Sequence, residues 1–337
     1  MMSNFIHLQS KSHYSISCGL PKTNEIVDKA IERGMDAVAL ADKNTFFGLV
    51  KFYNYAMKKG IKPICGVDFD VKVANGYTSL ILLAKNKNGL ENLFKLSTES
   101  FITSGIEKRS VPEEDILKNS SDLVCILPAS STNIKNLASK KEKELIEAEL
   151  SKYSDAFNKN FFLGASCFNE QGYDQATSFV CNLAHEKNIP VVALNDVLFL
   201  EKEDHLAHQA KVAINNSTLL KDEIDNPVVS NEQYFKTREQ LSVVHGEEPL
   251  NNTIEVAKLC NVFLEEGQYY LPSYEVQEGK TLSEHLEELA QTKLDDYLKN
   301  NKKLDKNIYQ ERLDKELKII IEKGYPGYFL IVMDFVK

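Results

Sequence analysis

Several features that would assign this chain to a class at once are missing from its sequence. No run of 18 apolar residues occurs, so we expect no membrane-spanning helix. The opening residues, MMSNFIHLQS, lack a basic stretch followed by an apolar one, so we expect no signal peptide. The motifs G-x-x-x-x-G-K-[ST], G-x-G-x-x-G, H-E-x-x-H and G-x-S-x-G are all absent, which leaves no phosphate-loop, dinucleotide, zinc-protease or serine-hydrolase signature.

Paired cysteines are also missing. Six cysteines are present, at positions 18, 65, 125, 167, 181 and 260. None forms a C-x-x-C pair, and the spacing fits neither a zinc ribbon nor a disulfide framework. Several lie in apolar runs such as VCIL, so we expect buried thiols in a reducing cytoplasm.

Positive charge is in short supply. The chain has 40 Lys and Arg residues against 49 Asp and Glu residues, a net charge of −9. This balance argues against a surface that grips phosphates throughout. It leaves room for a local basic groove or a protein-binding role, because a nucleic-acid enzyme can keep its basic channel in another domain.

The sequence does contain an alternation of short apolar runs and helical patterns over its first 200 residues. Some runs are apolar at nearly every position, which is typical of strands covered on both faces. The runs are FIHLQ (5–9), DAVALA (36–41), KPICGVDFDV (62–71), SLILLAK (79–85), LVCILPA (123–129), FFLGAS (161–166) and PVVALN (190–195). Alternation of this kind predicts a parallel sheet, and seven runs favour a barrel-like closure.

Amphipathic helices are predicted between these runs. Thr23 is a candidate N-cap for a helix that ends at Gly34, and residues 49–59 predict a second helix closed by Gly60. Further helices are predicted at 141–157, 172–187, 202–213, 237–244 and 248–262.

The segment 264–280 has no clear period and is interpreted as a domain boundary. Beyond it, Thr281 and Glu284 predict a capping box at the start of a helix. A second helix is predicted at 307–323, followed by a turn at 324–327. The chain stops inside the apolar run YFLIVMDFVK without a helix-stop signal, which indicates a piece of a longer protein.

One set of phrases, taken in order and spacing, resembles the N-terminal region of the α subunit of bacterial DNA polymerase III. The phrases are FIHLQSKSHYSISCG (5–19), GMDAVALADKNTFFGLVKFYNYAMKKGIKPICGVDFDV (34–71), LILLAKNKNGLENLFKLS (80–97), IPVVALNDVLFL (189–200), HLAHQAKVAI (205–214) and GYPGYFLIVMDFV (324–336). The resemblance covers essentially the whole chain. Many phrases in one order are far more specific than any single short motif.

The resemblance implies an α/β fold in two parts. Residues 1–270 would form a polymerase-and-histidinol-phosphatase (PHP) domain, a distorted seven-stranded (β/α) barrel similar to a TIM barrel. Residues 271–337 would be a mainly helical segment that opens the polymerase palm. The family's catalytic carboxylates, which hold two magnesium ions for nucleotidyl transfer, lie downstream of the GYFLIVM phrase, so no catalytic residue and no cofactor is expected in this chain.

Active PHP domains bind a metal cluster through His, Asp and Glu, and here the matching positions are largely changed. The H-x-H pair is matched by Gln9 and Lys11, and the Asp-His pair by Asp42 and Lys43. The other ligand positions are matched by Asp68, by Ser79, loosely by Phe168, and by Asp196 in the closing Asp-x-His motif. Three carboxylates remain, every histidine ligand is lost, and a protonated lysine cannot bind a metal ion.

The resemblance therefore implies a vestigial metal pocket in a scaffold that supports the palm and docks a separate proofreading exonuclease subunit. Other replisome subunits and DNA would be met through the rest of the parent DNA polymerase, with no membrane involved. The alternative is an active metal-dependent phosphoesterase or nuclease. We further hypothesise that Lys11 and Lys43 replace the lost metal ions among Asp42, Asp68 and Asp196. The bland alternative is that both lysines point into solvent.

Three histidines are more simply interpreted as structural residues than as metal ligands. His7 precedes the lost H-x-H pair and is expected in the core or on the surface rather than at the pocket. His205 and His208 stand three residues apart on a predicted helix, a spacing that can hold a metal ion, but no carboxylate partner is in evident register.

Overall fold

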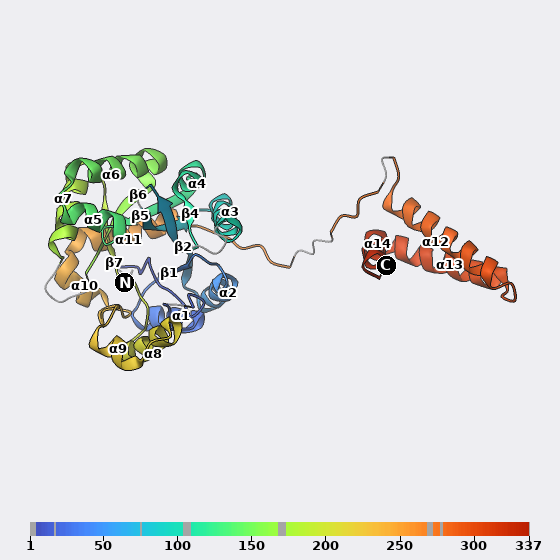
Figure 1. Cartoon of the computed structure of the whole chain (residues 1–337), viewed down its shortest axis with the longest axis horizontal. Coiled ribbons are helices and arrows are strands. Elements are labelled where there is room, and N and C mark those ends of the chain that lie inside the picture. The colour runs from blue at the N-terminus through green and yellow to red at the C-terminus, as the bar shows by residue number, and fades with distance from the viewer. Residues whose placement is uncertain are drawn as a thin grey trace. The chain divides into compact units, whose positions relative to one another are not determined.

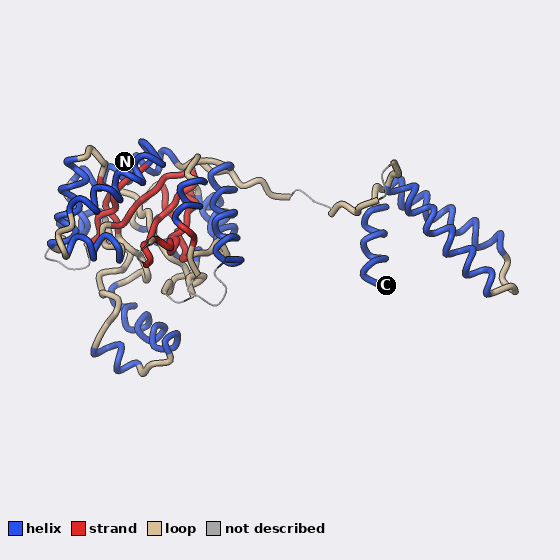
Figure 2. The backbone as a smooth tube through the Cα atoms, turned by 45° about the horizontal axis from the view of Figure 1, so that its top comes forward, coloured by secondary structure: helices blue, strands red, loops and turns tan. Residues whose placement is uncertain are grey.

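The computed structural model describes residues 5–16, 18–74, 76–103, 109–167, 173–267, 272–276 and 279–336. The chain divides into two compact units, Met1–Leu264 and Glu265–Lys337 (Figure 1). The division falls at the start of the segment without clear period. The first unit is a mixed α/β domain built on a curled sheet, and the second contains helices (Figure 2).

The sheet of the first unit follows the path β1–β2–β3–β5–β6–β7, with the short β4 paired to β2. The pairs β1–β2, β2–β4, β5–β6 and β6–β7 are parallel, whereas β3 is antiparallel to both of its neighbours. The strands are β1 Ala37–Lys43, β2 Lys62–Val73, β3 Gly76–Ala84, β4 Val111–Pro112, β5 Leu123–Pro128, β6 Phe161–Ser166 and β7 Val191–Leu194.

The direction of β3 corrects the prediction of a parallel sheet. Only two residues separate Val73 at the end of β2 from Gly76 at the start of β3. A parallel pair needs a crossover of a dozen residues or so, and a two-residue connection allows only an antiparallel hairpin. Gly76 has φ +125°, a conformation that favours glycine.

The first apolar run, residues 5–9, is not a regular strand, but the segment 5–11 joins the two edges of the sheet. Ser10 forms parallel bridges to Leu40 of β1 and to Val197, which lies just beyond β7. The Ala41 N–H donates to the Ser10 carbonyl at 2.9 Å, and the Lys11 N–H donates to the Val197 carbonyl at 3.0 Å. The segment thus closes the curled sheet into a ring, and the barrel-like fold class is confirmed.

Helices surround the sheet (Figure 1). They are α1 Thr23–Glu32, α2 Leu49–Lys59, α3 Lys87–Thr103, α4 Glu113–Lys118, α5 Thr132–Ser139, α6 Lys143–Phe157, α7 Gln175–Glu186, α8 His205–Asn216, α9 Leu220–Asp225, α10 Arg238–His245 and α11 Glu247–Leu259, with short 3₁₀ turns at Asn158–Asn160 and Lys202–Asp204.

The strands bury both of their faces. In β5, Leu123, Cys125 and Leu127 belong to a cluster shared with α3 to α7, whereas Val124 and Ile126 belong to a second cluster that includes residues of α11. Because alternate side chains of a strand point to opposite faces, a longer strand such as β5 contributes to two cores. This explains why the runs are apolar at nearly every position.

The helix ends mostly follow the predicted signals. Helix α2 covers residues 49–59, and Gly60 ends it in the left-handed conformation with φ +77°. The N-cap of α1 is Lys22 rather than Thr23. The Lys22 N–H donates to the Glu25 carboxylate at 2.8 Å, whereas Thr23 is buried and its methyl group lies close to Gly48.

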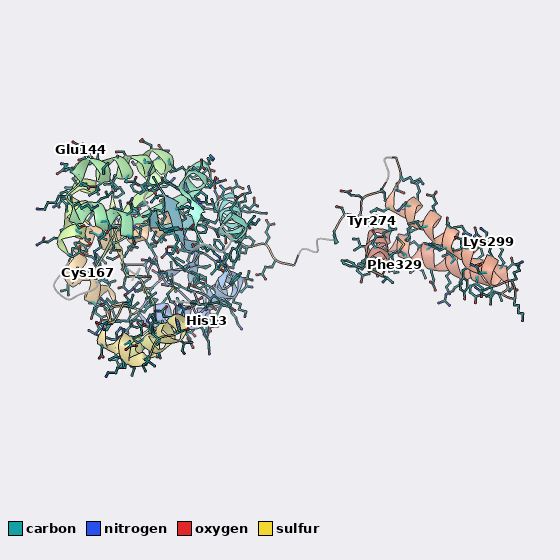
Figure 3. The ribbon with its side chains drawn as sticks, in the orientation of Figure 1. His13, Glu144, Cys167, Tyr274, Lys299 and Phe329 are labelled. Carbon is teal, nitrogen blue, oxygen red and sulfur yellow. The ribbon has the colours of Figure 1, made fainter. Side chains whose placement is uncertain are left out.

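The second unit contains α12 Leu282–Asn300, α13 Lys306–Glu322 and α14 Pro326–Val336. The predicted capping box is present, because Thr281 and Glu284 exchange hydrogen bonds of 2.8 and 3.2 Å. The predicted turn at 324–327 runs into α14, since proline suits the first turn of a helix. Many side chains of this unit, such as Lys299, project outward (Figure 3), and no described helix is long and apolar enough to cross a membrane.

Candidate functional site

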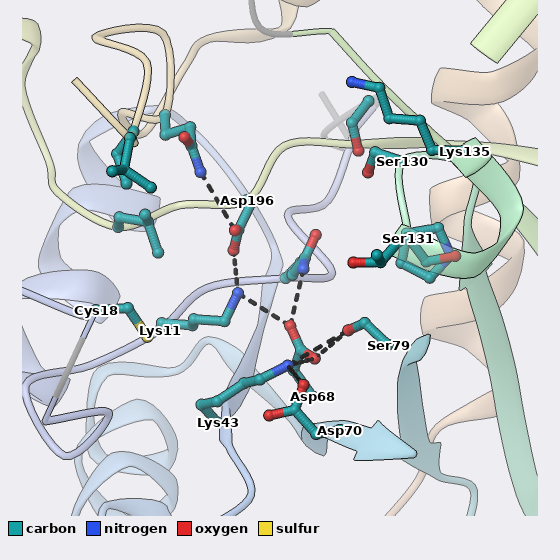
Figure 4. Close-up of a pocket in the computed structure, with 18 residues that line it drawn as sticks. Lys11, Cys18, Lys43, Asp68, Asp70, Ser79, Ser130, Ser131, Lys135 and Asp196 are labelled. Carbon is teal, nitrogen blue, oxygen red and sulfur yellow. Dashed lines mark hydrogen bonds and ion pairs between the residues drawn. The ribbon is translucent and has the colours of Figure 1, made fainter. Parts of the chain in front are cut away.

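A polar pocket of about 550 Å³ lies where the ends of several chain segments meet (Figure 4). Lys43 ends β1, Asp196 follows β7, and Lys11 ends the segment that joins them. Since these three segments run parallel, their carboxyl ends share one side of the ring. The pocket lining includes six predicted site residues, namely Gln9, Lys11, Lys43, Asp68, Ser79 and Asp196.

The ammonium group of Lys11 lies between two carboxylates. Its Nζ is 3.0 Å from Oδ2 of Asp68 and is also hydrogen-bonded to Oδ1 of Asp196. The Lys11 side chain is only 4% exposed. Burial by itself lowers the pKa of Lys11, but the charges of Asp196 and Asp68 outweigh burial and raise that pKa above its ordinary value. Lys11 is therefore held as a buried cation.

Lys43 supplies a second cation. Its Nζ is 2.8 Å from Oδ1 of Asp68 and 3.2 Å from Oδ1 of Asp70. The pairing register explains the contact, because Lys43 stands opposite Asp68 across the β1–β2 pair. Burial lowers the pKa of Lys43, but Asp68 and Asp70 outweigh burial, and the net shift of that pKa is upward.

Asp68 lies at the centre of these ion pairs and hydrogen bonds. Besides the two ammonium groups, its carboxylate accepts hydrogen bonds from Gln9 Nε2 at 3.1 Å and from Ser79 Oγ at 2.5 Å. Burial by itself raises the pKa of Asp68, but Lys11 and Lys43 dominate and hold that pKa well below its usual range. Asp68 is therefore an anion at any ordinary pH.

Asp42, the third predicted carboxylate, does not line this pocket. It turns into the loop after the segment 5–11, where it accepts hydrogen bonds from the Ser12 N–H at 2.7 Å, the Ser12 hydroxyl at 2.8 Å and the Ser15 hydroxyl at 2.6 Å. These partners are neutral. Burial raises the pKa of Asp42, and the serine hydrogen bonds oppose that shift.

Reasoning from the sequence missed two partners in the pocket. Asp70 is two residues beyond Asp68 on β2, so both face the same side of the sheet, and the D-F-D pattern at 68–70 carried that signal. Gln233 donates from Nε2 to Oδ2 of Asp196 at 3.2 Å. It comes from an irregular segment 37 residues further along the chain, and no sequence pattern marks it.

The three histidines considered above make structural contacts with backbone carbonyls. His7 is buried, with Nε2 2.9 Å from the Lys236 oxygen. His205 Nε2 lies 2.9 Å from the Val229 oxygen, and His208 Nε2 lies 2.6 Å from the Cys18 oxygen. None of them lines the pocket. Phe168, the loosely matched ligand position, lies outside the described residues.

The residues of the pocket do not fit the metal cluster that active PHP domains bind. A carboxylate cluster binds divalent ions through oxygen atoms that have no other strong partner. Here the carboxylate oxygens of Asp68 and Asp70 already lie within 3.2 Å of the ammonium groups of Lys11 and Lys43. An ammonium ion has no lone pair to offer a metal ion and would repel one at close range. Within the described ranges, no group of three His, Cys, Asp or Glu side chains is placed to hold a metal ion.

Comparison with known proteins gives matches in both units. Residues 7–165 match the PHP domain, and residues 284–337 match the bacterial DNA polymerase III alpha NTPase domain. DNA polymerase III subunit alpha of Buchnera aphidicola (Schizaphis graminum) is 34% identical to this chain, and that of Pseudomonas fluorescens is 32% identical. Each alignment covers 100% of this chain and 30% of the relative, so the chain spans about 30% of the length of these curated relatives.

Among solved structures, an amidohydrolase from Chromobacterium violaceum matches with a TM-score of 0.42 and 12% sequence identity. The match covers 57% of this chain and 87% of that one.

Proposed function

This chain consists of the N-terminal PHP domain and the start of the NTPase domain of a bacterial DNA polymerase III alpha subunit, and from that premise we propose that its PHP domain is a metal-free scaffold within a replicative DNA polymerase. Residues 1–270 form the scaffold, and residues 271–337 begin the palm that it supports. The scaffold also docks the proofreading exonuclease subunit. The parent enzyme works in the cytoplasm with DNA and other replisome subunits, and its magnesium ions belong to the palm.

One observation carries the metal-free part of this proposal, namely that two ammonium groups are paired with the three carboxylates of the pocket. Lys11 and Lys43 together contact Asp68, Asp70 and Asp196. A divalent ion would have to displace both lysines, which would then be left buried without partners. Leaving a buried charge unpaired is strongly unfavourable. The pocket is therefore stable as a set of internal ion pairs and poorly suited to activate a water molecule.

The metal content of the purified chain tests this proposal. We expect elemental analysis after exposure to Mn²⁺ or Zn²⁺ and desalting to find no stoichiometric metal. Stoichiometric metal that disappears in the Asp68→Asn variant would contradict the proposal and favour the alternative, an active metal-dependent phosphoesterase.

A triple variant provides the matched positive control. Gln9→His, Lys11→His and Lys43→His return imidazoles to the positions where the resemblance places ligands. We expect this variant, once circular dichroism shows that it is folded, to bind metal where the unaltered chain does not. Imidazole and carboxylate together are suitable ligands for transition metals.

Polymerase activity is expected only from a longer protein. The resemblance places the carboxylates for nucleotidyl transfer beyond the phrase GYFLIVM at 327–333. We therefore expect the 337-residue chain alone not to extend a primer. Extension above that of a mock preparation would show that the assignment of the catalytic carboxylates is wrong.

A further inference from the structure

Outside the pocket of ion pairs, aromatic side chains gather on one flank of the first unit. They come from the loop before α2 and from α3, two helices that lie on the same flank in Figure 1. The ring centroids of Phe47 and Phe101 are 6.1 Å apart, and those of Phe46 and Phe94 are 5.1 Å apart. These contacts bring together two parts of the chain that are distant in the sequence.

Three of these rings are open to solvent. Phe47 is 60% exposed, Phe101 is 42% exposed and Phe94 is 41% exposed. Ile102, next to Phe101 at the end of α3, is 76% exposed. Single exposed apolar residues are common, but a contiguous group of them marks a surface where another molecule binds.

Two hollows, of about 240 and 470 Å³, meet at Phe47, which lines both of them. Five of the sixteen residues that line the two hollows are aromatic, against 9% of the chain as a whole. An extended ligand that lies across Phe47 would therefore contact rings on both sides. We call the five aromatic residues the aromatic surface, and they are Tyr14, Phe46, Phe47, Phe94 and Phe101.

Two cations lie against the aromatic surface. Cζ of Arg109 is 3.7 Å from the centroid of the Phe101 ring, a cation–π contact. Nζ of Lys51 is 2.8 Å from the Tyr14 hydroxyl and 5.6 Å from the centroid of the same ring. Among the residues that the structure describes, neither cation is in an ion pair, so both charges are available to an anionic ligand.

Negative charge is scarce at the same place. Among the described residues that line the two hollows, Asp70 is the one carboxylate, and it is paired with Lys43 at 3.2 Å. On the exposed side of α3, Lys95 and Glu99 have opposite charges and cancel. The aromatic surface is thus locally cationic in a chain whose net charge is −9. Its charge is complementary to that of a polyanion.

Exposed rings beside unpaired cations suit single-stranded nucleic acid. Its bases stack on aromatic side chains, and its phosphates contact Lys and Arg. The bases of a duplex are already stacked on one another and are closed to the rings. An apolar protein segment would cover the rings but would leave Arg109 and Lys51 without anionic partners.

We propose that the aromatic surface binds single-stranded DNA. Bases stack on Phe47 and Phe101, while Arg109 and Lys51 contact the phosphates between them. DNA is preferred over RNA as the ligand because the chain belongs to a DNA polymerase family. The strand is held and not cleaved, and it lies outside the pocket of ion pairs. This contact goes beyond the scaffold function and does not depend on it.

Fluorescence anisotropy of a labelled oligothymidylate, titrated with the 337-residue chain at low salt, tests the proposal. We expect Phe47→Ala and Phe101→Ala each to weaken binding about tenfold, the effect of losing one base–ring stack. Phe263→Ala provides the matched control, because Phe263 is 69% exposed and lies outside the aromatic surface. It should bind like the unaltered chain. No binding by the unaltered chain, or equal losses in all three variants, would overturn the proposal.

The salt dependence of binding tests the role of the cations. Each phosphate that a cation neutralises on a single strand adds about 0.7 to the slope of log affinity against log salt concentration. We expect Arg109→Gln to weaken binding and to reduce that slope by about 0.7. Lys258→Gln, a change at an exposed lysine of α11, should leave the slope as it is. An unchanged slope in a folded Arg109→Gln chain would contradict the phosphate contact.

Two further measurements separate this ligand from the alternatives. Duplex DNA that binds as tightly as the oligothymidylate would overturn the stacking of bases on the rings. Self-association of the unaltered chain in sedimentation velocity, abolished by Phe47→Ala and without any binding of oligothymidylate, would assign the surface to a protein contact instead. Circular dichroism should show that Phe47→Ala is folded, because the ring is mostly exposed. The metal content of the pocket is measured separately, so either proposal can fail without the other.

Discussion

Asp42 and Asp68 sit on neighbouring strands, are almost equally buried, and have opposite surroundings. They are 1% and 2% exposed. Asp68 faces the pocket and is paired with two ammonium groups, whereas Asp42 faces a loop and is hydrogen-bonded by two serines. The pKa of Asp68 is lowered, and the pKa of Asp42 is raised. Burial alone therefore does not decide the charge of a carboxyl group, because the charge of its partners decides whether burial is overcome.

The two carboxylates should respond to pH in opposite ways. A carboxyl group whose pKa is lowered by folding stabilises the fold above its unfolded pKa of about 3.9, and this contribution is lost as the pH falls through the folded pKa. A carboxyl group whose pKa is raised contributes stability below about pH 3.9, and this contribution is lost as the pH rises through the folded pKa. Asp68 is of the first kind, and Asp42 is of the second.

Removing Lys11 should abolish the difference between Asp68 and Asp42 and should have the largest effect on stability. Lys11→Met leaves Asp68 with one cation and Asp196 with none, and we expect a loss of about 3–5 kcal/mol in the free energy of unfolding at pH 7. In this variant the pKa of Asp68 should rise, so the loss should shrink as the pH falls toward about 4. Urea unfolding monitored by circular dichroism, at pH 7 and at about pH 4, measures this loss in the free energy of unfolding.

An exposed lysine provides the control for Lys11→Met. Lys258 is 66% exposed and, among the residues that the structure describes, pairs only with Glu255 of its own helix. Lys258→Met should change the free energy of unfolding by no more than about 0.5 kcal/mol. A similar change for both variants would show that Lys11 is not a structural cation.

Removing Lys43 should reduce the difference between Asp68 and Asp42 without abolishing it. The Lys43 side chain is 23% exposed, and Lys11 remains beside Asp68 in the variant. We expect Lys43→Met to lose about 2 kcal/mol at pH 7 and to recover part of it in mild acid as the aspartates protonate. An unfolding midpoint equal to that of the unaltered chain at both pH values would favour the alternative in which this lysine only points into solvent.

Asp42→Asn should show the difference between the two carboxyl groups most clearly and should have the smallest effect on the free energy of unfolding. Asparagine keeps one acceptor oxygen for the serines and removes a buried charge, so we expect a loss of about 1 kcal/mol at pH 7. Because the pKa of Asp42 is raised, the loss should be larger near pH 4 than at pH 7, the reverse of Lys11→Met. A loss that grows with pH would contradict the assignment of Asp42 to a neutral environment.

The positions of most strands could be predicted because burial on both faces leaves a simple mark in the sequence. The runs at 62–71, 123–129 and 161–166 coincide with β2, β5 and β6. Strand direction leaves no such mark, and the reversal of β3 follows only from the short turn before it. The strand β4 is two residues long and has no period to detect.

The sequence could predict which residues line the pocket, but it could not predict all of the contacts that they make. The family resemblance brought Lys11, Lys43, Asp68 and Asp196 together as one group, and all four line the pocket. It did not predict that Asp42 turns away, because that depends on how the loop presents Ser12 and Ser15. Nor could it indicate the aromatic surface, since Phe47 and Phe101 come from parts of the chain that only the fold brings together.

The segment 5–11 has a consequence for how the domain is made on the ribosome. The Ile6 N–H donates to the Thr253 hydroxyl, 247 residues away, and His7 contacts the Lys236 carbonyl, 229 residues away. The segment leaves the ribosome early, yet its partners are synthesised near the end of the domain. The segment can pair with β1 early, but its other side, which bonds to Val197, stays unpaired until that part of the chain is made, and open strand edges invite misassembly. Closure of the ring therefore has to wait until residues up to about 253 have been synthesised, and the nascent domain keeps an open edge until then.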